Sequence, residues 1–193
     1  MSSHVPFDTP RERLRLPFMG GVYDHFAQPV GWLVFRAVIG LTLVMESLPK
    51  IADPMAQIGF LQAIGFYPGW FWSPLLAIAQ FVGGVMITLG LLTRPFALAN
   101  AVTLLVTVWY HLSFPYGDAF LTEAGVQVLK AGGDALMTPA GAKRLADGGA
   151  AFLHMVQLKA ELASLFWAGG CAIFAAFGGG PFSVDRCLLK KEF

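Results

Sequence analysis

Four long apolar stretches constrain the fold of this chain more than any other feature of its 193 residues. They cover about residues 30–48, 72–92, 95–114 and 152–177. A helix needs about 20 apolar residues to cross the hydrocarbon core of a bilayer. Charged residues make up 13% of the chain, against about 25% in soluble domains. We therefore expect an all-α integral membrane protein, folded as a four-helix bundle over residues 30–185.

The distribution of Lys and Arg predicts the orientation of these spans, because cytoplasmic loops carry an excess of both residues. The richer side holds Arg11, Arg13, Arg15, Arg94, Arg186, Lys190 and Lys191. The poorer side holds Lys50, Lys130, Lys143 and Arg144. We expect both termini in the cytoplasm, with residues 1–29 as a basic arm and 186–193 as a tail. Trp70, Trp72 and Trp109 then belong to the outer aromatic belt.

Two outer connections are more than simple loops. The segment 55–66 is apolar but too short to span, and it is flanked by Pro54 and Pro68. It predicts a short re-entrant or interfacial helix. The insert 115–149 between the third and fourth stretches is rich in Gly and Ala. Connections of this length are usually functional or disordered. We expect an ordered cap, with short helices near residues 121–129 and 140–145.

Glu161 is the residue of the fourth stretch that costs the most free energy to insert into a bilayer. A carboxylate at bilayer depth costs about 2.5–3.5 kcal/mol on insertion scales, and such residues usually face a bundle interior or a wet cavity. Gln157 and His154 precede Glu161 at helical spacings of four and seven residues. All three therefore lie on one side of the helix.

The other three stretches bring polar side chains to a similar depth in the outer half. Glu46 and Lys50 lie late in the first, Gln80 lies early in the second, and His111 ends the third beside Trp109. Simpler interpretations remain open: Glu46 and Lys50 form a boundary ion pair, and the histidines cap helices at the surface. The convergence predicts a ligand site formed by Glu161, Gln157, His154, Gln80, His111, Glu46, Lys50 and Trp109.

The residue types limit the chemistry of this site. Two histidines on different helices can ligate haem or hydrogen-bond a quinone head group. Their position near the interface, with a flexible insert between them, favours quinone over haem. His154 and Glu161 lie two helical turns apart, so no metal site is predicted. The net charge of +1 gives no indication of a nucleic-acid partner.

Four further residues have expected structural roles. Arg36 lies in the inner half of the first span, where it can pair with Asp185 or bind a lipid phosphate. Arg94 sits in the short turn between the second and third spans and helps to set the topology. Gly178 opens a Gly-Gly-Gly sequence that ends the last helix and turns the tail along the inner surface.

The order of these residues resembles the DoxX family of small bacterial and archaeal membrane proteins. The resemblance rests on Arg36-x-x-x-Gly40, on QFVGG from Gln80, on LGLLTR ending at Arg94, and on GGGPFSVD ending at Asp185. It covers about residues 30–185 and implies four helices in the cytoplasmic membrane. Two features depart from the family pattern. Gln80 stands where a carboxylate is common, and a neutral amide cannot act as a proton-accepting base. The insert 115–149 is an addition.

The resemblance implies a redox context, since members include a subunit of thiosulfate:quinone oxidoreductase. One hypothesis is a quinone-binding oxidoreductase subunit that has no redox centre of its own and needs a partner that carries one. A second is a non-catalytic subunit whose insert 115–149 docks a membrane or extracytoplasmic protein. A third is a solute or proton pathway, which the apolar inner half disfavours. Membrane lipid is a partner in every case.

Overall fold

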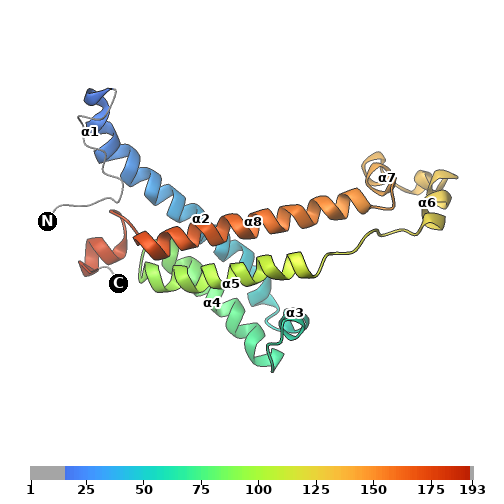
Figure 1. Ribbon diagram of the computed structural model, residues 1–193, viewed down its shortest axis with the longest axis horizontal. Coiled ribbons are helices and arrows are strands. Elements are labelled where there is room, and N and C mark those ends of the chain that lie inside the picture. Colours follow the sequence, from blue (N-terminus) through green and yellow to red (C-terminus); the bar gives the residue numbers. More distant parts are fainter. Residues whose placement is uncertain (1–15, 192–193) are drawn as a thin grey trace. The chain divides into compact units, whose positions relative to one another are not determined.

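A computed structural model describes residues 16–191 of the chain (Figure 1). The predicted basic arm with Arg11, Arg13 and Arg15 lies outside these residues. The described part is helical, and no β-strand occurs within it. This confirms the predicted all-α class.

Four helices are long and apolar enough to cross a membrane. They are α2 (Gln28–Ala52), α4 (Gly69–Leu89), α5 (Thr93–Ser113) and α8 (Ala150–Phe177). The first helix continues back through η3 (Tyr23–Ala27) and α1 (Gly20–Val22), so it begins about ten residues before the predicted span. Hydropathy detects the part of a helix that suits lipid, whereas the helix itself continues past it. These four helices confirm a multi-pass membrane protein.

The chain divides into two compact units. The described part of the first unit comprises residues 16–103 and 167–191, and the second comprises residues 104–166. Helices α5 and α8 each contribute to both units.

Small residues let the helices of the first unit approach closely. A Cβ built on Gly40 of α2 would lie 2.8 Å from the carbonyl oxygen of Gly84 on α4. A Cβ on Gly83 would collide with the side chain of Asn100 on α5. Trp32 of α2 meets Phe174 of α8 edge to face, with ring centroids 5.3 Å apart. Segments of α2, α4, α5 and α8 thus pack together within this unit, as the predicted four-helix bundle requires.

The turn after α8 is fixed to the rest of the first unit by Arg36, whose side chain is 2% exposed. Its Nη1 donates to the carbonyl of Gly179, and its Nη2 donates to that of Phe182 at 2.9 Å. Gly178 ends α8 with φ +79°, as expected, and its carbonyl accepts from Trp32 Nε1 at 3.2 Å. The turn is therefore held by side chains of α2.

Asp185 caps the beginning of α5. Its Oδ1 accepts from Leu92 N at 2.8 Å, and its Oδ2 accepts from Thr93 N at 3.1 Å and Thr93 Oγ1 at 3.2 Å. Of the two alternatives for Arg36, the charge of Asp185 does act on the guanidinium. Both side chains form their hydrogen bonds with turn and helix-end groups, which lack partners of their own.

The predicted short helix at residues 55–66 is α3 (Ile58–Ala63). It packs against the first turn of α4, where a Cβ on Gly69 would lie 2.9 Å from Ile58. The hydroxyl of Ser73, buried on α4, donates to the carbonyl of Pro54 and accepts from Gln57 N at 3.3 Å. This segment is therefore folded back onto α4.

The second unit contains the insert, which forms α6 (Glu123–Lys130), η4 (Gly133–Leu136) and α7 (Pro139–Leu145). Thr122 and Thr138 cap the two α-helices through bonds from Gly125 N and Gly141 N. The base of the insert is closed because Phe120 N and Leu121 N donate to the carbonyl of Gly148 at 2.8 and 3.1 Å. These helices fall close to the two predicted at 121–129 and 140–145.

Candidate functional site

Gln157 of α8 connects three parts of the second unit. Its Nε2 donates to the backbone carbonyl of His111 on α5 and to Glu161 Oε1 at 2.9 Å. Its Oε1 accepts from the backbone N–H of Tyr116 at 2.8 Å. The His111 carbonyl needs this bond because the residue four positions later is Pro115, which has no N–H to donate. Gln157 is therefore the cap of α5 as well as a support for Glu161.

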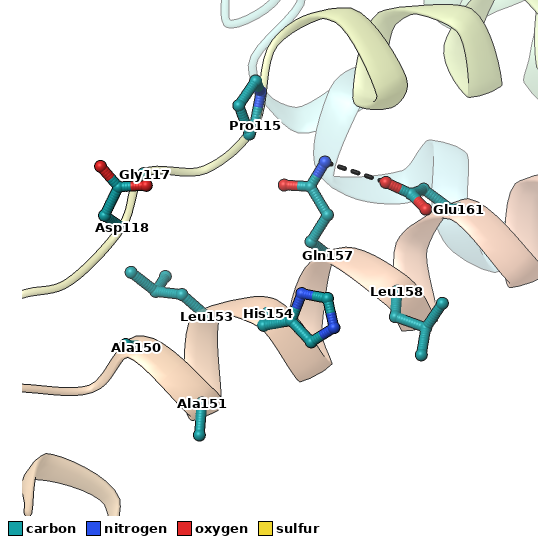
Figure 2. Close-up of a pocket in the computed structure, with 10 residues that line it drawn as sticks. All are labelled: Pro115, Gly117, Asp118, Ala150, Ala151, Leu153, His154, Gln157, Leu158 and Glu161. Carbon is teal, nitrogen blue, oxygen red and sulfur yellow. Dashed lines mark hydrogen bonds between the residues drawn. The ribbon is translucent and has the colours of Figure 1, made fainter. Parts of the chain in front are cut away.

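A cavity of about 540 Å³ lies beside this connection, within the second unit. The loop after α5 and the first turns of α8 face it from two sides (Figure 2). Its lining residues are Pro115, Gly117, Asp118, Ala150, Ala151, Leu153, His154, Gln157, Leu158 and Glu161. The stripe of His154, Gln157 and Glu161 expected from the sequence thus lines one cavity.

The bond between Gln157 and His111 also fixes the depth of the cavity along α8. Helix α5 has 21 residues and is about 31 Å long, so it just covers a hydrocarbon core of about 30 Å. His111 lies in its last turn, so Gln157 is level with the last turn of α5. The first two turns of α8, with His154, therefore extend about 10 Å beyond the level of His111. Glu161 lies one turn further along α8 and lines the same cavity.

Two aromatic residues near the cavity, Tyr116 and His111, also carry polar groups. The pKa of Tyr116 is raised, first by burial and then by Tyr110 and the carboxylate of Glu161, so its hydroxyl stays protonated at neutral pH. The Tyr116 ring packs edge-on against His111, with centroids 5.5 Å apart. His111 was predicted to bind ligand, but what it contributes here is its backbone carbonyl. Its buried ring Nδ1 has no hydrogen-bond partner.

A second polar pair lies in the first unit. Lys50 Nζ donates to Gln80 Oε1 at 2.6 Å, and Gln80 is 5% exposed. Glu46 lies exposed one turn before Lys50. The alternative in which Lys50 serves only as the ion-pair partner of Glu46 is therefore incomplete, because the ammonium group also bonds α4.

The structure brings the predicted site residues together in two sets, one in each unit. Lys50 and Gln80 form one set, and His154, Gln157 and Glu161 form the other together with the His111 carbonyl. Trp109, half exposed, packs on Phe114 with ring centroids 6.4 Å apart and is not among the cavity residues. Within residues 16–191, no three His, Cys, Asp or Glu side chains gather as a metal site.

Sequence reasoning missed the loop side of the cavity, Pro115, Gly117 and Asp118. Helical periodicity predicts which residues share a face of α8, but a loop has no such period. The one available signal was Pro115, which leaves the carbonyl four residues earlier without its helical partner.

Comparison with known proteins agrees with the expected family. Residues 31–112 match the DoxX family model. Inner membrane protein YqjF of Escherichia coli (strain K12) is 27% identical over 165 residues, which cover 85% of this chain and 96% of that protein. No solved structure matches the chain. The family match includes the Lys50–Gln80 pair but ends before the cavity loop.

Proposed function

Since this chain is a DoxX-family multi-pass membrane protein, we propose that it binds a quinone-class ligand in the cavity beside Gln157. The observation that supports this proposal is the lining of that cavity. His154, Glu161 and Asp118 supply its available polar groups, while Leu153 and Leu158 supply apolar surface. Ligand pockets of about 300–1,000 Å³ with few polar groups on an apolar wall are typical of small-molecule sites.

The position of the cavity suits an amphipathic ligand. We place the end of α5 at the membrane boundary, because its 21 residues match the hydrocarbon thickness. A polar head group can then reach His154 while a prenyl tail stays in lipid. Leu158 lines the cavity and is 45% exposed, and Leu162, one turn deeper on α8, is 57% exposed. These side chains offer the tail an apolar path along α8.

The chain's own residues have distinct roles in this proposal. Gln157 holds Oε1 of Glu161, which leaves Oε2 to accept a hydrogen bond or a proton from the ligand. His154 can donate or accept at its ring nitrogens. A bound quinone would supply two-electron, two-proton chemistry. Electron transfer would then need a protein partner that carries a redox centre.

The proposal is tested by blocking the cavity. Ala151→Trp places an indole in the cavity, whereas Met155→Trp places it on an exposed position of the same helix outside the lining. Binding of a decyl-quinone and of its reduced form is measured by calorimetry with the protein in lipid nanodiscs. We expect Ala151→Trp to weaken binding at least tenfold and Met155→Trp to leave it unchanged. Equal binding by the parent protein and both variants would place the ligand elsewhere, and no binding at all would end the proposal.

A second candidate function is docking of a partner protein by the insert. It is favoured by the exposed apolar side chains of Leu136 and Val128, which are 91% and 69% exposed. Replacing residues 122–145 by a short Gly-Ser linker keeps the Phe120–Gly148 closure. This replacement should release a co-purifying subunit while the membrane helices still fold. If the same subunits co-purify without the insert, the docking function is excluded.

A further inference from the structure

The hydrogen bonds of Gln157 decide what the cavity can offer a ligand. Both N–H groups of its amide are used, one by the His111 carbonyl and one by Glu161. Its oxygen already accepts from Tyr116 N. An amide has two donors and one oxygen, so the donor capacity of Gln157 is exhausted. The side chain of Gln157 therefore gives no donor to a ligand.

The remaining polar side chains of the lining are mainly acceptors. Asp118 and Glu161 are carboxylates, which accept hydrogen bonds and donate none when ionised. Among the lining side chains, His154 alone is left to donate. The other members are Gly, Ala, Leu and Pro, which carry no polar side-chain atoms. Figure 2 shows Asp118 on the loop and Glu161 on α8, so the two acceptors come from different elements.

A ligand must complement these acceptors to bind. A quinone ring has carbonyl oxygens but no O–H group, so it cannot donate a hydrogen bond to the carboxylates. A quinol has two hydroxyl groups, and a hydroxyl donated to a carboxylate forms a strong, charge-assisted hydrogen bond. Glu161 is half-buried, so leaving its carboxylate desolvated and unpaired beside a bound ligand is unfavourable, whereas Asp118 is exposed.

We therefore propose that this cavity selects the reduced, hydroxyl-bearing form of its ligand, a quinol, over the oxidised quinone. The inference rests on the proposed function and deepens it by assigning the redox form that is bound. Glu161, held by Gln157 at Oε1, accepts one hydroxyl at Oε2. Asp118 accepts from the other side of the cavity, and the ring lies near Leu153 and Leu158.

Three matched probes separate the possibilities: a decyl-hydroquinone, the corresponding quinone, and the hydroquinone dimethyl ether, which keeps the shape but has no donors. Dissociation constants are measured anaerobically in nanodiscs. We expect the hydroquinone to bind at least tenfold more tightly than the other two. Glu161→Gln supplies N–H donors in the same shape, so it should lower hydroquinone affinity and raise quinone affinity. Asp118→Asn should act in the same direction, and Met155→Ala should retain the preference.

Other patterns of probe binding would contradict the proposal in different ways. Binding of quinone as tight as that of hydroquinone would overturn the selection while leaving the proposed function intact. No binding of any probe would overturn the proposed function itself. A decylamine that binds while the hydroquinone does not would assign the carboxylates to a cationic ligand and overturn the inference. Circular dichroism of each variant distinguishes lost selectivity from lost folding.

Discussion

Gln157 illustrates how a residue in a candidate site can serve structure first. Its spacing from Glu161 predicted a ligand-binding role, and it does line the cavity. Its amide is nevertheless occupied by His111, Tyr116 and Glu161. The reason lies four residues after His111, where Pro115 removes a backbone donor. The polar stripe of α8 thus combines one residue that holds the fold with two, His154 and Glu161, that remain available.

Asp147, another single residue, gives a prediction about the pH dependence of stability. Its carboxylate accepts from Ala151 N at 2.9 Å and from Gly149 N at 3.0 Å, and these bonds lower its pKa. The folded state therefore favours the charged form. The stabilisation of the first turn of α8 is fully present above the ordinary pKa of 3.8 and is lost as the pH falls through the lower folded value.

Hydrogen exchange at the Gly149 and Ala151 amides tests this prediction. After correction for intrinsic exchange, protection should stay constant from neutral pH down to about pH 5 and fall in acid below the ordinary pKa. Asp147→Asn cannot titrate, so its protection should be lower throughout and free of this acid transition. An identical transition in the Asn variant would assign the pH dependence to another group.

At the scale of elements, the lengths of the four spans could be predicted because each apolar run is long enough to cross the bilayer. The ends were harder to predict. The first helix extends back to Gly20, since helix formation continues where hydropathy falls. The hydrogen-bond partners of Arg36 and Asp185 were not predicted, because sequence shows the two charges but not the free carbonyls of a turn or the free N–H groups of α5. The candidate site was predictable on α8 and not on the loop.

The contact between the tail and the α4–α5 turn gives a prediction about stability. Gly90 has φ +74°, and an added Cβ would lie 2.6 Å from both Arg36 Nη1 and Ser183 Cβ. Gly90→Ala should therefore destabilise the protein by at least about 2 kcal/mol, from backbone strain and displacement of the tail. Unfolding by denaturant in detergent measures the change.

Gly31→Ala is the matched control, because Gly31 lies in α2 and an added Cβ meets nothing within 4 Å. Its effect should stay within about 0.5 kcal/mol or be slightly stabilising. Equal effects of the two substitutions would mean that the tail does not depend on close contact at Gly90.

At the scale of the whole molecule, the two natural cysteines can test the predicted orientation. Cys187 is exposed in the tail, whereas Cys171 is buried in α8. If both termini are cytoplasmic, a membrane-impermeant maleimide should label Cys187 only after permeabilisation of the cells. Cys171 should stay unlabelled until the protein is denatured, which provides an internal control. Labelling of Cys187 in intact cells would reverse the assigned topology.

The hydrogen bonds of Arg36 also relate the fold to the order of its biosynthesis. Their acceptors, Gly179 and Phe182, follow Arg36 by 143 and 146 residues. At about 5–20 residues per second, a ribosome needs roughly 7–30 s to add that segment. Throughout this interval the guanidinium of the first helix lacks the carbonyls that bind it in the folded protein. A nascent chain that stops before Gly179 therefore lacks both of these hydrogen bonds, so the turn that follows α8 can be fixed to α2 only after the last helix has been synthesised.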